Sequence, residues 1–368
     1  MASLSDLPLR DDLRGLTPYG APQLDVRVRL NVNENAHPIP ETAARDVVEA
    51  VARAVLTANR YPDREFTALR EALAGYVGND ITPEQLWAAN GSNEVLQHVL
   101  QAFGGPDRTA LGFDPTYSMH PIITASTGTS WASGERDAGY ELSPATVTKW
   151  ITQVDPDIVF LCSPNNPTGT PVTNDTIEAA YAATRGIVIV DEAYIEFAPQ
   201  GTPTALSLLP GRERLVVSRT MSKAFAFAGA RVGYLVADPA VIDAMRLVRL
   251  PYHLSSLTQA AATAALAHAD ALLANVDDIR QQRDRLLTEL PKLGYTVWPS
   301  HTNFVLFGSV ADPQRTFRQL LERSVLIRDV GIAHHLRVTA GTEAETTTFL
   351  EALAELDGGA HDSAAKVD

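Results

Sequence analysis

The chain has a single cysteine, Cys162, among its 368 residues. No disulfide can therefore form within it, which fits a reducing cytoplasm. The sequence also lacks an uninterrupted apolar run long enough to span a membrane. Its first residues carry neither the basic segment nor the apolar segment of a secretory signal. We therefore expect a cytoplasmic protein that does not contact a membrane.

The chain has fewer basic than acidic residues: 30 Lys and Arg and 44 Asp and Glu give a formal net charge of -14. This surplus of negative charge disfavours non-specific binding to nucleic acid and favours solubility. A ligand that carries phosphate must be held by a local cluster of basic side chains.

Several catalytic signatures are absent as well. The nine histidines include no His-Glu-x-x-His run, and one cysteine cannot form a metal-binding pair, so no metal site is expected. No glycine-rich dinucleotide loop or Walker loop follows a strand-like run, which weakens nucleotide-binding interpretations. The Gly-x-Ser-x-Gly run of many hydrolases is missing, although Ser-His-Asp catalysis stays open on sequence alone.

Apolar strand-like runs alternate with helical stretches between Trp87 and Val236. The clearest runs cover residues 158–161, 187–190 and 215–217. Because these runs are continuous rather than alternating, the strands should be covered on both faces, as in a mostly parallel sheet. The expected fold class is therefore α/β, with helices on both faces of the central sheet.

Helical periodicity marks both sides of this region. An amphipathic helix is predicted over residues 41–59, and residues 257–290 are strongly helical up to Pro291. After Pro291 the pattern is shorter and indicates a smaller α+β domain. Its predicted elements are strands at 303–307, 325–327 and 336–338 and helices at 317–323 and 343–356.

These patterns divide the chain into four segments. We expect an extended N-terminal arm over residues 1–30 and a large domain over residues 31–256. A small α+β domain should occupy residues 257–357, and a frayed tail of small and polar residues should follow over 358–368.

Lys223 lies just past the predicted strand 215–217, at the end where open α/β sheets bind their ligands. Hydroxyl side chains precede it and Arg231 follows it, a combination that suits a phosphate. An amine beside a phosphate site suggests pyridoxal 5'-phosphate, which a lysine holds as a Schiff base. A solvated lysine at a strand-to-loop corner is the alternative. The hydroxyl-bearing residues are Ser218, Thr220 and Ser222.

Asp191 ends the apolar run 187–190, and Tyr194 follows three residues later. A carboxylate at the end of a buried strand is costly unless a cation pairs with it. A protonated pyridine nitrogen would be such a cation, and the pairing would keep the ring an effective electron acceptor. Tyr194 could hydrogen-bond the hydroxyl oxygen of that ring. Taken alone, an aspartate that caps the next helix is the commoner explanation.

Three further segments contain residues that could bind such a cofactor. In the rigid loop 163–169, Asn166 could also donate to the ring hydroxyl oxygen. Segment 90–94 precedes a helical pattern whose first N–H groups suit an anion, so Ser92 could cap the helix, bind phosphate, or do both. Tyr117 could stack on a flat cofactor ring, although an aromatic residue at a strand end belongs more often to the core.

Arg328 and Arg337 fall in the small domain, the latter within a predicted strand. A partly buried arginine needs an anionic partner. That partner could be the α-carboxylate of an amino-acid substrate or an Asp or Glu of the same domain, and the sequence favours neither.

Taken in chain order, these segments resemble the motif series of fold-type-I aminotransferases that depend on pyridoxal phosphate, over essentially the whole chain. Within that superfamily the chain resembles the histidinol-phosphate aminotransferases. It departs from their pattern at Ala36-His37-Pro38, where a tyrosine-proline pair is frequent, and in the short stretch between Arg328 and Arg337. The supporting segments are residues 13–19, 30–35, 59–63, 327–329, 336–339 and 341–342.

The resemblance implies roles for the cofactor site. Lys223 would bind the cofactor covalently and move protons, Asp191 would pair with the pyridine nitrogen, and Tyr117 would stack on the ring. Tyr194 and Asn166 would contact the ring hydroxyl oxygen. The residues implied in binding the cofactor phosphate are Ser92, Asn93, Thr220, Ser222 and Arg231.

Roles beyond the cofactor follow from the same resemblance. In the family a tyrosine of the partner subunit, here Tyr61, reaches the cofactor phosphate, which implies a homodimer with shared active sites. Arg337 would bind the substrate α-carboxylate or the equivalent end of histidinol phosphate, and Asn166 is a further candidate for binding the substrate. Arg328 and Tyr19 would help to recognise the substrate phosphate.

The implied reaction exchanges an amino group between histidinol phosphate and 2-oxoglutarate, giving imidazole acetol phosphate and glutamate in histidine biosynthesis. The nearest alternative is an aromatic amino-acid aminotransferase on the same scaffold. Relatives that decarboxylate a phosphorylated amino acid, and an α/β ligand-binding protein without the cofactor, also remain. Whether His37 or His120 contacts the substrate stays open.

Overall fold

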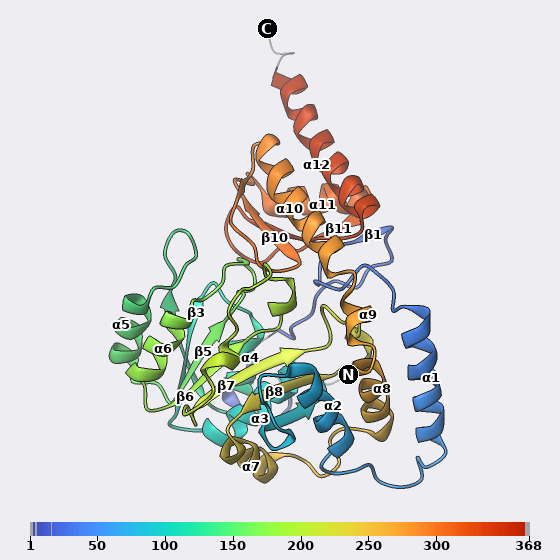
Figure 1. Cartoon of the computed structure of the whole chain (residues 1–368). Coiled ribbons are helices and arrows are strands. Elements are labelled where there is room, and N and C mark those ends of the chain that lie inside the picture. The colour runs from blue at the N-terminus through green and yellow to red at the C-terminus, as the bar shows by residue number, and fades with distance from the viewer. Residues whose placement is uncertain (1–2, 4–5, 16, 365–368) are drawn as a thin grey trace.

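A seven-stranded sheet forms the centre of the larger part of the molecule in the computed structural model, which describes residue 3 and residues 6–15 and 17–364 (Figure 1). Its strand order is β2-β8-β7-β6-β5-β3-β4. Only β8 runs antiparallel to its neighbours β7 and β2, and the remaining pairs are parallel. The expected α/β fold with a mostly parallel sheet is therefore confirmed. The strands are β2 (Leu86–Ala89), β3 (Thr109–Asp114), β4 (Ser130–Glu135), β5 (Ile158–Cys162), β6 (Ile187–Asp191), β7 (Leu215–Thr220) and β8 (Gly233–Ala237).

The central strands are buried at every residue, which explains their continuous apolar sequences. Helices cover them: α3 contacts β8, β2 and β7, and α5 and α6 pack against each other. The helices of this part are α1 (Glu41–Val55), α2 (Thr67–Val77), α3 (Ser92–Phe103), α4 (Met119–Ser126), α5 (Pro144–Val154), α6 (Asn174–Ala183), α7 (Pro239–Val248), α8 (Ser256–Leu266) and α9 (Ala269–Leu273).

A second, smaller core lies beyond this sheet, toward the top of Figure 1. It contains the antiparallel sheet β12-β10-β9, and the end of the expected arm joins it because β1 pairs with β11 in parallel. Tyr194 and Ala224 of the large part also pack in this core, so the two parts meet close to Lys223, which directly precedes Ala224. The elements are β1 (Val28–Arg29), α10 (Val276–Lys292), β9 (Thr296–Val297), β10 (Phe304–Gly308), α11 (Pro313–Glu322), β11 (Val325–Leu326), β12 (Leu336–Thr339) and α12 (Glu343–Ala364).

The helical stretch expected over 257–290 is three helices, α8, α9 and α10, and Pro291 lies inside α10 rather than ending it. Buried residues of α8 and α9 belong to the core of the large part, whereas Val276 of α10 belongs to the second core. Helix α8 also packs on α1 and α2. We therefore place the start of the small domain near Val276 instead of at residue 257.

The end of the chain differs from the expected frayed tail. Helix α12 continues to Ala364, so residues 358–364 are helical, and residues 365–368 lie outside the described part. Figure 1 shows this helix projecting away from the rest of the molecule. Within the described residues, no helix combines the length and the apolar character that a bilayer crossing needs.

Candidate active site

The carboxyl ends of β5, β6 and β7 bring polar side chains together, since Cys162 pairs in register with Asp191 and Asp191 with Ser218. A cavity of about 100 Å³ opens at this edge. It gathers every residue that the sequence predicted for the cofactor except Tyr61, and adds Cys162 and Ala193. The predicted residues that line it are Ser92, Asn93, Tyr117, Asn166, Asp191, Tyr194, Thr220, Ser222, Lys223 and Arg231.

Lys223 follows β7 and points its amine into this cavity. The Nζ atom donates to the backbone oxygen of Val32, at 2.9 Å, and within the described residues it forms no ion pair with a carboxylate. Desolvation lowers the pKa of Lys223 to about 8, and the positive charges of Arg337 and Arg231 act in the same direction. A larger share of this amine is therefore neutral at pH 7 than of an ordinary lysine.

Asp191 is 2% exposed and accepts two hydrogen bonds, from Ser218 Oγ (3.0 Å) and from His120 Nε2 (3.0 Å). His120, in the first turn of α4, is fully buried and stacks on Phe160 with ring centroids 4.7 Å apart. No lysine or arginine in the described ranges forms an ion pair with Asp191. Because a carboxylate oxygen only accepts, His120 Nε2 donates this hydrogen bond and orients the carboxylate.

Sequence reasoning left open whether His120 contacts the substrate, and it did not connect this histidine to Asp191. A signal was present, because a buried carboxylate must find hydrogen-bond donors. The alternative role of Asp191 as a helix cap is wrong, since Tyr194 precedes the short 3-10 helix that follows β6.

The first turn of α3 closes the other end of the cavity. Gly91 caps this helix, so Ser92 is its first residue rather than its cap. A Cβ atom on Gly91, whose φ is +90°, would stand 2.5 Å from Nη2 of Arg231, and one on Gly233 would stand 2.1 Å from the backbone nitrogen of Ser92. Because these two positions lack side chains, the N-terminus of α3 and the Arg231 guanidinium can lie close to the hydroxyl groups of Thr220 and Ser222. Such a cradle fits a phosphate.

A second cavity of about 190 Å³ shares Tyr117 and Asn166 with the first and is lined by Tyr19, Arg328 and Arg337 as well. Arg328 pairs with Arg337 through backbone hydrogen bonds. Its guanidinium lies 5.8 Å from the centre of the Tyr19 ring. The predicted substrate residues therefore lie together, directly beside the predicted cofactor residues.

Arg337 is only 7% exposed, yet it has no carboxylate partner among the described residues. Its Nη1 donates to Asn166 Oδ1 at 2.5 Å, its Nη2 donates to the Asn31 oxygen at 2.9 Å, and its Nε has no partner. Burial lowers the pKa of Arg337. The internal ion pair that the sequence left open is absent among the described residues, so no carboxylate there neutralises the charge of the guanidinium.

Comparison with known proteins assigns the family. The model of class I and II aminotransferases matches residues 26–353. The chain is 60% identical, over 97% of both proteins, to the histidinol-phosphate aminotransferase of Paenarthrobacter aurescens. It is 54% identical to that of Thermobifida fusca, over 97% of this chain and 98% of the relative. The chain belongs to the histidinol-phosphate aminotransferases, within class I and II.

The fold is shared more widely than the sequence. The crystal structure of histidinol-phosphate aminotransferase from Sinorhizobium meliloti, in complex with pyridoxal-5'-phosphate, matches 96% of this chain and 98% of its own with a TM-score of 0.84. The two sequences are only 23% identical, so this likeness speaks for the fold. The expected aminotransferase scaffold is confirmed.

Tyr61 lies apart from the aminotransferase site of its own chain. It is 79% exposed and stacks on Tyr252, with ring centroids 4.4 Å apart. It lines neither of the two cavities described above. This placement leaves the side chain open to contact another molecule.

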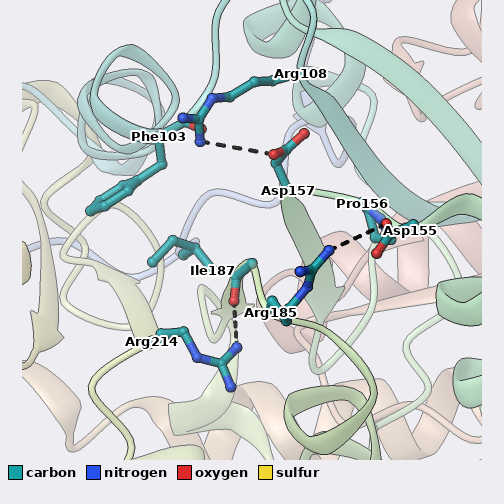
Figure 2. A pocket seen from close by; sticks show the side chains of 9 residues that line it. Phe103, Arg108, Asp155, Pro156, Asp157, Arg185, Ile187 and Arg214 are labelled. Carbon is teal, nitrogen blue, oxygen red and sulfur yellow. Dashed lines mark hydrogen bonds and ion pairs between the residues drawn. The ribbon is translucent and has the colours of Figure 1, made fainter.

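A larger cavity, of about 440 Å³, lies at the amino ends of the same strands (Figure 2). Its charged groups satisfy one another or the backbone: Arg214 donates to the Gly186 oxygen, and Arg108 lies 3.8 Å from Asp157. None of the predicted site residues lines it. Size alone therefore does not identify the active site of this aminotransferase.

Proposed function

We propose that this chain exchanges an amino group between histidinol phosphate and 2-oxoglutarate, with pyridoxal 5'-phosphate as cofactor, as a step of histidine biosynthesis in the cytoplasm. The observation that carries the proposal is a buried Arg337, without a carboxylate partner among the described residues, beside a cavity that holds Lys223 and Asp191. The names of the relatives supply the substrate, because those proteins are histidinol-phosphate aminotransferases.

The cavity fits the cofactor in its charges. Asp191 offers a carboxylate that no lysine or arginine in the described residues neutralises, which suits the pyridine nitrogen. Tyr194 Oη already accepts a hydrogen bond from Asn33 at 2.9 Å and lies 3.5 Å from Asn166 Nδ2, so both suit the ring hydroxyl. The phosphate would be held by Ser92, Asn93, Thr220, Ser222 and Arg231. Bound pyridoxal phosphate supplies a carbonyl carbon that takes up the amino group and a ring that accepts electrons.

The residues of the chain provide binding and proton transfer. With its lowered pKa, Lys223 Nζ would take the proton from the substrate Cα and pass it to the cofactor carbon that receives the amino group. In the second half of the exchange the same amine would move a proton in the opposite direction, onto the Cα of the second substrate. Arg337 binds the α-carboxylate of 2-oxoglutarate and glutamate and the equivalent end of histidinol phosphate. Arg328 and Tyr19 bind the substrate phosphate. Both substrates are anions, so one pair of arginines can serve them in turn.

We further propose a homodimer in which Tyr61 of the partner subunit completes the cofactor phosphate site. Exposed apolar side chains near Tyr61 support a contact surface there, at Leu56 of the α1 C-terminus and at Leu250 and Tyr252 before α8. Sedimentation should report a dimer. The Tyr61→Phe variant should bind the cofactor more weakly and should still sediment as a dimer. A monomeric active enzyme would contradict this arrangement.

Steady-state kinetics separate the proposed substrate from the nearest alternative. We expect kcat/KM for histidinol phosphate to exceed that for phenylalanine, and comparable values would favour an aromatic amino-acid aminotransferase. Borohydride reduction followed by peptide mapping should label Lys223, and Lys223→Ala should abolish turnover and the visible absorption of the bound cofactor. Purified protein that never binds the cofactor would favour a ligand-binding function.

A further inference from the structure

A closed ring of contacts joins the two domains just outside the substrate cavity. Arg337 donates to Asn166 Oδ1 at 2.5 Å. Two residues before Arg337, His335 Nε2 lies 3.2 Å from the hydroxyl of Tyr140 in the loop before α5. Thr170, four residues after Asn166, donates through Oγ1 to the Tyr140 backbone oxygen at 2.8 Å. The first two of these hydrogen bonds cross between the domains, and the third lies within the large domain.

Hydrogen bonds and aromatic packing fix the small-domain side of this ring. His335 Nδ1 lies 2.6 Å from the Ala333 oxygen and must carry a proton, so Nε2 accepts from the Tyr140 hydroxyl. Trp298 packs beside both rings, with centroids 5.0 Å from His335 and 5.1 Å from Tyr140. A Cβ atom on Gly308 would come within 3.0 Å of His335 Nε2, so a glycine leaves room for the pair.

The large-domain side holds Tyr140 in a backbone conformation that bulky residues rarely adopt, with φ at +61°. Arg136, 9% exposed, donates through Nη1 to the Tyr140 oxygen at 3.2 Å. Within the described ranges no carboxylate forms an ion pair with Arg136, whose Nε donates to the Phe113 oxygen. Arg136 and Thr170 therefore hold the backbone of Tyr140 in place, while its hydroxyl contacts His335 of the small domain.

We propose that the Tyr140–His335 hydrogen bond positions Arg337 against Asn166 and thereby sets the affinity for the anionic end of both substrates. Neither Tyr140 nor His335 lines the cofactor cavity or the substrate cavity, so any effect on substrate passes through other residues. His335 immediately precedes β12, in which Arg337 is the second residue, so loss of the Tyr140–His335 hydrogen bond leaves the Arg337 guanidinium less restricted. The inference rests on the proposed role of Arg337 as the substrate ligand.

Tyr140→Phe removes the hydroxyl and keeps the ring against Trp298. We expect KM for histidinol phosphate and KM for 2-oxoglutarate each to rise about five-fold, the loss of one ordinary hydrogen bond, while kcat changes by less than about two-fold. Cofactor affinity should stay unchanged. His335→Ala should reproduce the effect, and His335→Gln, which offers an amide oxygen, should recover most of the wild-type KM.

A matched control removes a tyrosine hydroxyl elsewhere. Tyr76 contacts Glu196 at 3.4 Å and lines neither cavity, so Tyr76→Phe should leave both KM values within about two-fold. The decisive comparison uses Arg337→Gln, which by itself should raise both KM values. Because Tyr140 acts through Arg337, adding Tyr140→Phe to this variant should produce no further rise.

The outcomes are distinguishable. Unchanged KM values in Tyr140→Phe, even with a lowered melting temperature, would overturn the positioning role and leave the proposed function intact. A further five-fold rise in the double variant would show that Tyr140 acts independently of Arg337, and would overturn the inference as well. Unchanged KM values in Arg337→Gln would overturn the substrate role of Arg337 together with the inference.

Discussion

The reactivity of Lys223 in the cofactor-free protein tests the electrostatics of the cavity. Its pKa is lowered to about 8 by desolvation, with Arg337 and Arg231 adding to the effect and Glu34 opposing it. At pH 7 about 9% of an amine with that pKa is neutral, against about 0.03% for an unperturbed lysine. The neutral amine is the nucleophile, so Lys223 should react about 300-fold faster than an unperturbed lysine of equal intrinsic reactivity.

The assay is competitive labelling of the cofactor-free protein with a trace amine reagent from about pH 6 to about pH 11, read by peptide mass spectrometry. The exposed Lys149 serves as the internal reference. Because the folded-state pKa of this base is depressed, its labelling rate should rise with pH and level off above about pH 8. Arg337→Gln removes a repelling positive charge and should move the midpoint upward.

Two results would refute this reasoning. A Lys223 midpoint near the unperturbed value of 10.5 would mean that the cavity does not desolvate the amine. A midpoint near 8 that does not move in Arg337→Gln would mean that Arg337 is too far away, or too well screened, to act on Lys223.

The remaining predictions concern stability and the phosphate cradle. Arg219 bonds Glu192 through two nitrogens at 3.0 and 2.8 Å, and both residues are buried, so Arg219→Met should lower the free energy of unfolding by about 3–5 kcal/mol in denaturant titration. Arg185→Met, which removes a pair 3.7 Å apart with an arginine side chain 93% exposed, should change it by less than about 0.5 kcal/mol. Gly91→Ala places a Cβ atom 2.5 Å from Arg231 Nη2 at a positive φ, so cofactor titration should show weakened affinity, and unchanged affinity would contradict the cradle.

Continuous apolar runs made the central strands predictable, because each run alone implies burial on both faces. The breaks between α8, α9 and α10 had no such signal. They fall at Ala267-His268 and Ala274-Asn275, without proline or glycine, and only the weak helix propensity of His268 and Asn275 marks them in the sequence. The chain bends there because α8 packs on α1 and α2 while α10 joins the second core. Tertiary packing, which local sequence does not encode, decided those boundaries.

The convergence of the predicted cofactor residues could be foreseen for a related reason. Parallel strands end at one edge of the sheet, so motifs that follow 158–161, 187–190 and 215–217 had to meet. The histidine that supports Asp191 was not predictable in this way. His120 reaches the carboxylate from α4, and that contact depends on how the helix lies against β5, where Phe160 stacks on its ring.

The sequence could not tell whether Arg337 pairs with an Asp or Glu of its own domain or with a substrate anion. An ion pair depends on where every Asp and Glu of the fold stands, so no local pattern can exclude one. In the described structure the guanidinium meets amide and backbone oxygens and the face of Phe304, all of them neutral. Neutral acceptors orient the cation without cancelling its charge, and burial makes that charge costly until an anion arrives. Such a site would suit carboxylates and phosphate esters alike, as the proposed exchange of two substrates through one cavity requires.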